Sequence, residues 1–318
     1  MGKPSEPFDT AATPQESRIR NNESHRGSRR GKSRPSPRRS SPTRRSFTAT
    51  LKALDELASS GAKVSVHITD LDRGTTVLQG DDYVVLPVAG LGVVPLLIEV
   101  AAGFEAGTLD PLEIIERSTV APVAVAGIWQ HLKAPALPIV DLAVLAASAG
   151  DALAANALLE RVGLEAIRAR IEQMGHVRSA LLDQFRDERG LDDAPQVALG
   201  SARELAELFA ALVNSQIVSP GVSAQVAEWL SLNHDLSLVA AATGLDPFAH
   251  DNDEHGLLFV NKTGRAAGVR VEAGVLAGPR AGVAYALSVC FDDLSIMHRT
   301  RAHDAFRTLG TELMEYVF

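Results

Sequence analysis

The 318-residue sequence has little cysteine and few aromatic residues. Its one cysteine is Cys290, and Phe, Trp and Tyr together make up 5% of the chain. A single cysteine cannot form an internal disulfide, and its place in the apolar run 283–291 predicts a buried, unreactive thiol. We find no apolar stretch that is long enough and free enough of charge to span a bilayer. The remaining composition, 46% hydrophobic and 22% charged, predicts one large or bilobed globular domain.

Acidic residues are scarce at the beginning of the chain. Residues 1–46 hold 12 Lys and Arg against 4 Asp and Glu, a net charge of +8, while the remainder holds 19 against 35, a net charge of −16. With almost no aliphatic residues to bury, 1–46 is predicted to be a disordered basic tail. It is either a solubilising extension or an electrostatic contact for nucleic acid, anionic lipid or an acidic protein. Because no aromatic residues alternate with the arginines, nucleic acid is the less favoured of these partners.

The pair Arg44 and Arg45 resembles a twin-arginine export signal, which requires an apolar core directly afterwards. The next segment instead places Leu51, Leu54 and Leu57 on one face of a helix whose other face is charged. This pattern indicates an amphipathic helix of a folded domain. We therefore expect a cytoplasmic protein without a transmembrane segment.

Hydrophobic periodicity divides the rest of the chain into strands and helices. Alternating or apolar runs predict strands at 63–70, 75–79, 257–264, 269–277 and 282–291. Apolar residues at helical spacing predict helices near 51–58, at 95–106, 139–162 and 202–213, and from about 300 to 316. Ser201 is placed to cap the helix that follows it.

This order of elements predicts an α+β fold in which terminal helices cover an antiparallel sheet. An all-helical lobe is inserted after the second strand. The expected sheet lobe comprises 47–88 and about 230–318, and the expected helical lobe about 89–229. Together they form one domain, 47–318, behind the tail.

Four segments in the same order resemble class A β-lactamases and the penicillin-binding-protein-like serine hydrolases related to them. They are 87–97 with 105–110, then 122–129, then 150–163, and last 261–264 with 268–270. No single short match is specific, but four in order, covering about residues 48–318, are strong evidence for the fold. The resemblance implies the β-lactamase/transpeptidase-like architecture, in agreement with the order of strands and helices.

The residues that carry the family's chemistry are missing from this sequence. Where the family has a nucleophilic Ser and an activating Lys one helical turn later, this chain has Gly90 and Val93. The family's Ser-Asp-Asn is replaced by Gly150, Asp151 and Ala152. Acyl transfer needs a nucleophile, a base within hydrogen-bond reach, a proton relay and oxyanion donors. The resemblance therefore predicts the fold, and these substitutions predict a catalytically degenerate protein, a pseudoenzyme.

The Lys-Thr-Gly strand of the family is intact as Lys262, Thr263 and Gly264. It is either a remnant of ancestry or a retained anion site in which the ammonium binds a carboxylate. Arg270, on the following strand, would supply a second cation. We favour the retained site, since this motif survives while the others have lost their side chains.

Two acidic residues remain as candidates for residual acid or base chemistry. Asp151 retains its place in the altered Ser-Asp-Asn motif, and Glu188 begins a segment that loosely resembles the family's Glu-x-x-Leu-Asn loop. For Glu188, the alternative is that 183–193 is simply a charged surface loop, and we favour this alternative. His and acidic residues within 250–255 resemble a metal-ligand cluster, but no helix fixes their spacing, so we predict no metal site and no cofactor.

Three functions agree with these observations. The leading hypothesis is a non-catalytic protein that binds an anionic small molecule or a peptide end in a groove between the lobes. The first alternative is an enzyme of altered acid or base chemistry on the same scaffold, which would require a strongly shifted pKa. The second is an interaction protein that acts through the basic tail.

Overall fold

The computed structural model of the chain describes residues 47–250, 256–293 and 295–318. The predictions about the basic tail 1–46, and about most of the possible metal-ligand cluster, lie outside these residues. The described part from Phe47 onward belongs to one compact unit.

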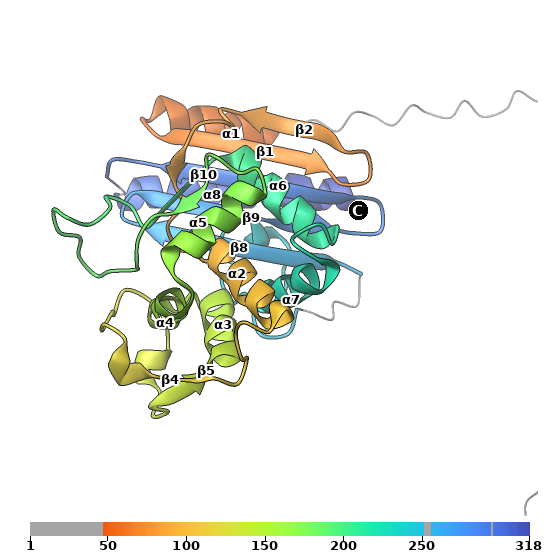
Figure 1. The fold of residues 1–318 in the computed structure, drawn as a ribbon. Helices are drawn as coiled ribbons and strands as arrows, with labels where there is room; N and C mark the ends of the chain where they lie inside the picture. The colour runs from red at the N-terminus through yellow and green to blue at the C-terminus, as the bar shows by residue number, and fades with distance from the viewer. Residues whose placement is uncertain (1–46, 251–255, 294) are drawn as a thin grey trace, which may run out of the picture. The chain divides into compact units, whose positions relative to one another are not determined.

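A five-stranded antiparallel sheet joins the two ends of this unit (Figure 1). Its strands lie in the order β2-β1-β10-β9-β8. Their bounds are Lys63–Asp70 for β1, Thr75–Gly80 for β2, Leu258–Ala266 for β8, Val269–Ala277 for β9 and Gly282–Cys290 for β10. The register pairs Lys63 with Cys290, so the first strand of the domain lies beside the last. The predicted antiparallel sheet is confirmed, with strand bounds shifted by two residues at most.

Helices cover both faces of the sheet, and each face has its own apolar core. On one face, α1 (Thr48–Ser59) and α8 (Ile296–Val317) pack over side chains that include Ile68, Tyr285 and Leu287. On the other face, α6 (Ala202–Val213) packs against β1, β9 and β10, in a core that includes Val271 and other small apolar residues. The same core continues into the inserted lobe, where α2 (Val93–Ala106) packs among the other helices. The single thiol of Cys290 is buried, and burial raises its pKa to about 11. A thiol that stays protonated is a poor nucleophile, as the sequence predicted.

The inserted lobe is mainly helical. Besides α2 and α6 it holds α3 (Ile139–Ser148), α4 (Ala152–Val162), α5 (Leu164–Gln173) and α7 (Pro220–Ser231). The segment predicted as one helix, 139–162, is two, because Gly150 takes a left-handed φ of +61° and Asp151 caps α4. Sequence reasoning did not single out α7, although Ser219 followed by a proline marks its beginning, and the Ser219 hydroxyl accepts from the Val222 amide.

Short strands also belong to this lobe, which the helical pattern did not predict. β4 (Ile114–Glu116) pairs with β5 (Ala136–Pro138). β3 (Leu86–Pro87) and β6 (Ala180–Leu181) pair with β7 (Ala198–Gly200). Strands of two or three residues are too short to show alternation, so periodicity could not reveal them. The sheet formed by β3, β7 and β6 fixes the position of the chain at Leu86 and Pro87, just before the turn that leads into α2.

Within the described residues, one helical stretch is long and apolar enough to span a membrane by length and composition, contrary to the sequence expectation. It comprises the 3₁₀ helix η1 (Ala89–Gly92) together with α2, with a mean hydropathy of 1.6 over Ala89–Ala106. This stretch is 72% buried inside the protein, as the core helix of a globular domain would be. A single such helix is weak evidence for a membrane span.

Candidate functional site

The turn that precedes α2 lies directly against β8. The Cβ of an alanine at Gly264 would fall 2.1 Å from the Val88 carbonyl oxygen and 3.1 Å from the Leu91 amide nitrogen. A glycine at this point of β8 is therefore required by the close approach of two backbones. Just beyond Val88, Ala89 adopts a left-handed φ of 47°, which is a strained conformation for a residue with a side chain.

Gly90 follows this strained residue and faces β8. A Cβ built at Gly90 would lie 3.6 Å from the Thr263 carbonyl oxygen, an ordinary van der Waals distance. The backbone at this position therefore leaves room for a small side chain. The nucleophile is absent because the residue is glycine, and not because the site is closed. Val93, which replaces the activating lysine, is buried in the core of the helical lobe.

Gly150 lies beside Lys262, although 112 residues separate them in the sequence. The Cβ of a residue at Gly150 would be 3.7 Å from the Lys262 Nζ atom. Because Gly150 has a left-handed φ of +61°, the backbone of a serine at this position would be strained. The structure thus brings together four of the residues selected from the sequence, Gly90, Gly150, Lys262 and Thr263, which we name the Lys262 site.

Asp151 has a structural place next to this site. Its carboxylate accepts hydrogen bonds from the amides of Ile128 and Trp129, both at 2.7 Å, and of Ala154 at 2.9 Å. A Cβ at Gly127 would collide with this carboxylate at 2.3 Å. Buried and bound by three backbone donors, Asp151 caps α4 and holds the 127–129 turn, which favours a structural role over acid or base chemistry. Ala152, the next residue, is buried at the first position of α4.

Lys262 is the titratable group at the centre of the site. Its side chain is 3% exposed, and Nζ donates to the Asn233 Oδ1 atom at 3.3 Å. Burial lowers the pKa of the Lys262 ammonium from 10.5 to about 8, although Asp235 and Glu272 favour its charged form. At pH 7 the amine is mostly protonated and close to its titration range.

A chain of buried polar side chains connects Lys262 with the middle of the sheet. Asn233 donates to the Asn261 Oδ1 atom at 2.9 Å, and Asn261 donates to the Glu272 Oε1 atom at 2.8 Å. The Tyr285 hydroxyl donates to the same oxygen at 2.7 Å, and the Val239 amide donates to Oε2 at 2.7 Å. Burial raises the pKa of the Glu272 carboxyl from 4.5 to about 7 against these bonds. Because Glu272 is only partly ionised near neutral pH, Asp235 is the main counter-charge close to Lys262.

Thr263 is bonded to an internal carboxylate. Its hydroxyl donates to the Asp235 Oδ2 atom at 2.7 Å, and Arg265 Nη2 donates to Oδ1 at 2.7 Å. Burial alone would raise the pKa of Asp235, but Arg265 together with the hydroxyls of Thr263 and Ser237 outweighs it, so the pKa is lowered. Asp235 is therefore ionised at neutral pH and forms a charge-assisted pair at the surface of the site.

Arg270 does not share the face of Lys262. The register pairs Arg270 with Arg265 and Lys262 with Ala273, so by alternation Arg270, Arg265 and Thr263 lie on one face of the sheet and Lys262 lies on the other. Asp235, which binds Thr263 and Arg265, is nevertheless close enough to Lys262 at this edge strand to favour its charged form. The Arg270 guanidinium donates to the carbonyl oxygens of Val269 at 2.7 Å and Ala266 at 3.2 Å. The structure therefore places Arg270 in the β8–β9 hairpin rather than beside the Lys262 ammonium.

Glu188 is exposed in the loop between β6 and β7. Ion pairs of Asp183 with Arg186 and Arg189 hold this loop. The Asn156 side chain donates to the Phe185 carbonyl oxygen and accepts from the Phe185 amide. No hydrogen bond of the described structure directs the Glu188 side chain toward Lys262. This arrangement favours the charged surface loop over a catalytic carboxylate.

Comparison with known proteins places this geometry in a family. A sequence profile of the beta-lactamase enzyme family matches residues 46–317. The chain belongs to this family. No curated protein sequence matches it.

Solved structures agree on the fold. The beta-lactamase from Sphaerobacter thermophilus superposes with a TM-score of 0.73 at 20% identity, covering 86% of this chain and 97% of that one. PBP-A superposes with a TM-score of 0.67 at 19% identity, covering 85% and 95%. A beta-lactamase from Xanthomonas campestris pv. campestris gives 0.68 at 14%, covering 86% and 98%. At these identities the likeness shows the β-lactamase/transpeptidase-like fold alone.

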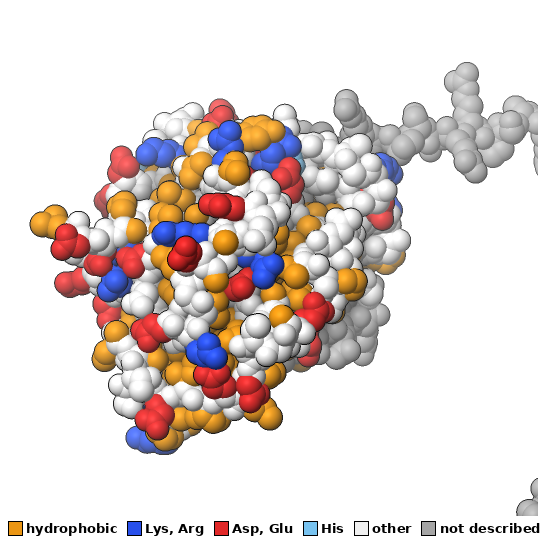
Figure 2. All heavy atoms as spheres, in the orientation of Figure 1, with side chains coloured by type: hydrophobic (Ala, Val, Ile, Leu, Met, Phe, Trp, Pro, Cys, Tyr) orange, Lys and Arg blue, Asp and Glu red, His pale blue; other side chains and the backbone are white. Residues whose placement is uncertain are grey.

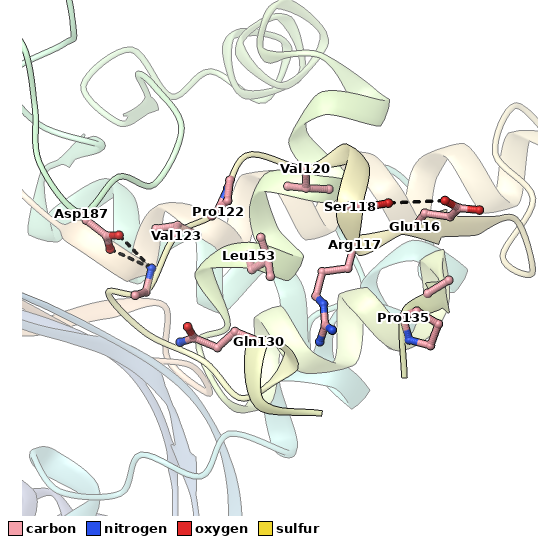
Figure 3. A pocket seen from close by; sticks show the side chains of 12 residues that line it. Glu116, Arg117, Ser118, Val120, Pro122, Val123, Gln130, Pro135, Leu153 and Asp187 are labelled. Carbon is pink, nitrogen blue, oxygen red and sulfur yellow. Dashed lines mark hydrogen bonds between the residues drawn. The ribbon is translucent and has the colours of Figure 1, made fainter. Parts of the chain in front are cut away.

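This beta-lactamase family member also has a cavity of about 600 Å³ in the helical lobe, apart from the Lys262 site (Figure 3). Its wall is mostly apolar, with Val120, Val123 and Leu153. Its polar members hold neighbouring loops: Arg117 donates to the carbonyl oxygens of Trp129 and Leu132, and Asp187 accepts from the Ala124 amide. These bonds account for Arg117 and Asp187 without a ligand.

Sequence reasoning missed Asn233, Asp235, Glu272 and Tyr285. One signal was available, since Glu272 is a carboxylate within the otherwise largely apolar strand β9. A buried charge of this kind requires partners. Among the residues that the structure describes, no group of three or more His, Cys, Asp and Glu could hold a metal ion. His250 is the described member of the cluster considered above.

Replacing Gly264 by Ala should destabilise the protein by about 3 kcal/mol or more, because its Cβ would force β8 away from the turn at Val88. Gly90→Ala is the matched control. Its Cβ has room, so the free energy of unfolding should change by less than about 0.5 kcal/mol. Urea denaturation of both variants measures the difference. Equal effects would contradict the backbone contact.

The contribution of Glu272 to the free energy of unfolding should fall as the pH rises from about 4.5 to 7. In this range the unfolded protein loses the Glu272 proton while the folded protein keeps it, so the unfolded state binds fewer protons. The raised pKa corresponds to a loss of about 3 kcal/mol. Denaturation at pH 5 and pH 7.5 should show that Glu272→Gln becomes more stable relative to the wild-type protein as the pH rises. An unchanged dependence would mean that Glu272 does not titrate in this range.

Proposed function

We propose that this beta-lactamase family member is a pseudoenzyme that binds an anionic small molecule or a peptide end at the Lys262 site. The observation that carries the proposal is the position of the Lys262 ammonium beside Gly150 and next to Thr263. The cationic part of the site remains, while the positions that would hold nucleophile and relay are glycines. A ligand would therefore bind and leave chemically unchanged.

The missing side chains argue against acyl transfer. Gly90 offers no oxygen nucleophile, Val93 offers no amine, and Gly150 offers no hydroxyl to transfer a proton. In serine proteases, the oxyanion hole and substrate binding alone retain only about 10³–10⁴-fold acceleration over water. Such a remnant would be too little for efficient hydrolysis of a β-lactam.

The hydrogen bonding of Lys262 supports anion binding. An ammonium group has three N–H donors, and the described structure gives Nζ one hydrogen-bond acceptor, Asn233 Oδ1. Donors therefore remain for a ligand carboxylate, and burial strengthens a charge-assisted bond. The scattered charge on the face drawn in Figure 2 also supports a local ligand site over a broad basic surface for nucleic acid.

Penicillin G is a suitable probe, because a solved PBP-A structure is an acyl-enzyme complex with it. After incubation with this protein, the intact mass should remain unchanged, and calorimetry should detect reversible binding. Lys262→Met should weaken that binding about 10-fold or more by removing a charged donor. A stable adduct or turnover would instead favour an enzyme of altered chemistry.

The affinity for penicillin G should be constant below about pH 7 and should fall above pH 8. The reason is that Lys262, with its pKa lowered to about 8, loses the charge that binds the carboxylate. Lys262→Arg stays charged throughout, so any residual binding by this variant should lack the alkaline decline. A decline of equal size in both proteins would exclude Lys262 as the group that titrates.

A further inference from the structure

Asp235 occupies the place at Thr263 and Arg265 where a ligand carboxylate would be expected. It lies four residues after the end of α7, and its two oxygens accept from the Thr263 hydroxyl and from Arg265, each at 2.7 Å. Ser237 adds two more bonds, from its hydroxyl at 2.8 Å and from its amide at 3.3 Å. A hydroxyl and a guanidinium that converge on two carboxylate oxygens form a carboxylate-binding site. In this protein the carboxylate is supplied by the chain itself.

This arrangement can exchange its carboxylate. The Asp235 side chain is 28% exposed and that of Arg265 is 41% exposed, so water reaches both partners. Access to solvent weakens an ion pair, so this partly buried pair is open to competition from a ligand. In contrast, Asp151 is 1% exposed and bound by three backbone amides. Of these two carboxylates, only Asp235 is placed to yield to a ligand.

We propose that Asp235 is a specificity-determining residue of the Lys262 site, an internal carboxylate that competes with any ligand carboxylate for Thr263 and Arg265. The inference rests on the proposed function. It also predicts which ligands the site accepts. Under the proposed function an anionic group binds the Lys262 ammonium, but a carboxylate that also approaches Thr263 must first displace Asp235 and meets its negative charge. A ligand with a neutral or cationic group at that end binds without this penalty.

The test compares two probes, penicillin G, which carries a carboxylate, and its neutral methyl ester. Asp235→Ala should bind penicillin G about 10-fold more tightly or better than the wild-type protein does, since a like charge and a competitor are removed. Its affinity for the ester should change by less than about 3-fold. Asp235→Asn retains the shape of the side chain and should give an increase in the same direction if Asp235→Ala fails to fold.

Asp246→Asn is the matched control for general electrostatics. It neutralises one exposed Asp in the same part of the chain, where the carboxylate accepts only from the Phe248 amide among the described contacts. Its affinity for penicillin G should equal that of the wild-type protein. An increase as large as that of Asp235→Asn would overturn the proposal, because net charge alone would then explain the effect.

The remaining outcomes separate this inference from the proposed function. If penicillin G binds equally to wild-type protein and both Asp235 variants, and Lys262→Met abolishes binding, Asp235 has no role in specificity although the Lys262 site stands. If neither the wild-type protein nor any Asp235 variant binds penicillin G or its ester, both ideas are wrong. Tighter binding by the Asp235 variants, lost again when Lys262→Met is added, supports both.

Discussion

The site depends on one contact between two backbones, that of β8 with the turn before α2. Gly264 allows the Val88 carbonyl to approach so closely that a Cβ would lie 2.1 Å away. This contact places Gly90 beside Thr263 and begins α2, the apolar helix at the centre of the inserted lobe. Since β8 is also the edge strand of the sheet, the same contact joins the sheet to the lobe. Without it, the residues of the Lys262 site would have no common scaffold.

The fold can persist after the chemistry is lost because the two depend on different atoms. Backbone approach at Gly264, the cap at Asp151 and the burial of α2 determine where the site lies. The nucleophile position contributes little to packing, since a Cβ at Gly90 would make only ordinary van der Waals contacts. Ala89 nevertheless keeps its left-handed φ of 47°. Strain of this kind costs about 1–3 kcal/mol and persists where the surrounding structure determines it.

Local pattern in the sequence was sufficient for the strands of the sheet and for the cap at Ser201, since alternation and capping act within a few residues. The resemblance to class A β-lactamases, rather than local pattern, identified Gly90, Gly150, Lys262 and Thr263, which the fold brings together. Local pattern could not predict the bonds from Asn233 to Asn261 or from Thr263 to Asp235, because 28 residues separate the members of each pair. Such partners follow from tertiary packing. Arg270 illustrates the same limit, since only the register shows that it lies on the opposite face from Lys262.

The charges around the site are balanced within the chain. Lys262 is buried with one hydrogen-bond acceptor among the described residues, and Asp235 neutralises Arg265 beside it. Glu272, with its pKa raised to about 7, contributes part of a negative charge that depends on pH. A buried cation without any counter-charge would be costly, so the acidic partners help to keep Lys262 protonated. They also compete with a ligand carboxylate for the same donors. Stability and affinity therefore place opposite demands on Asp235, and the balance between them determines which anions the site can accept.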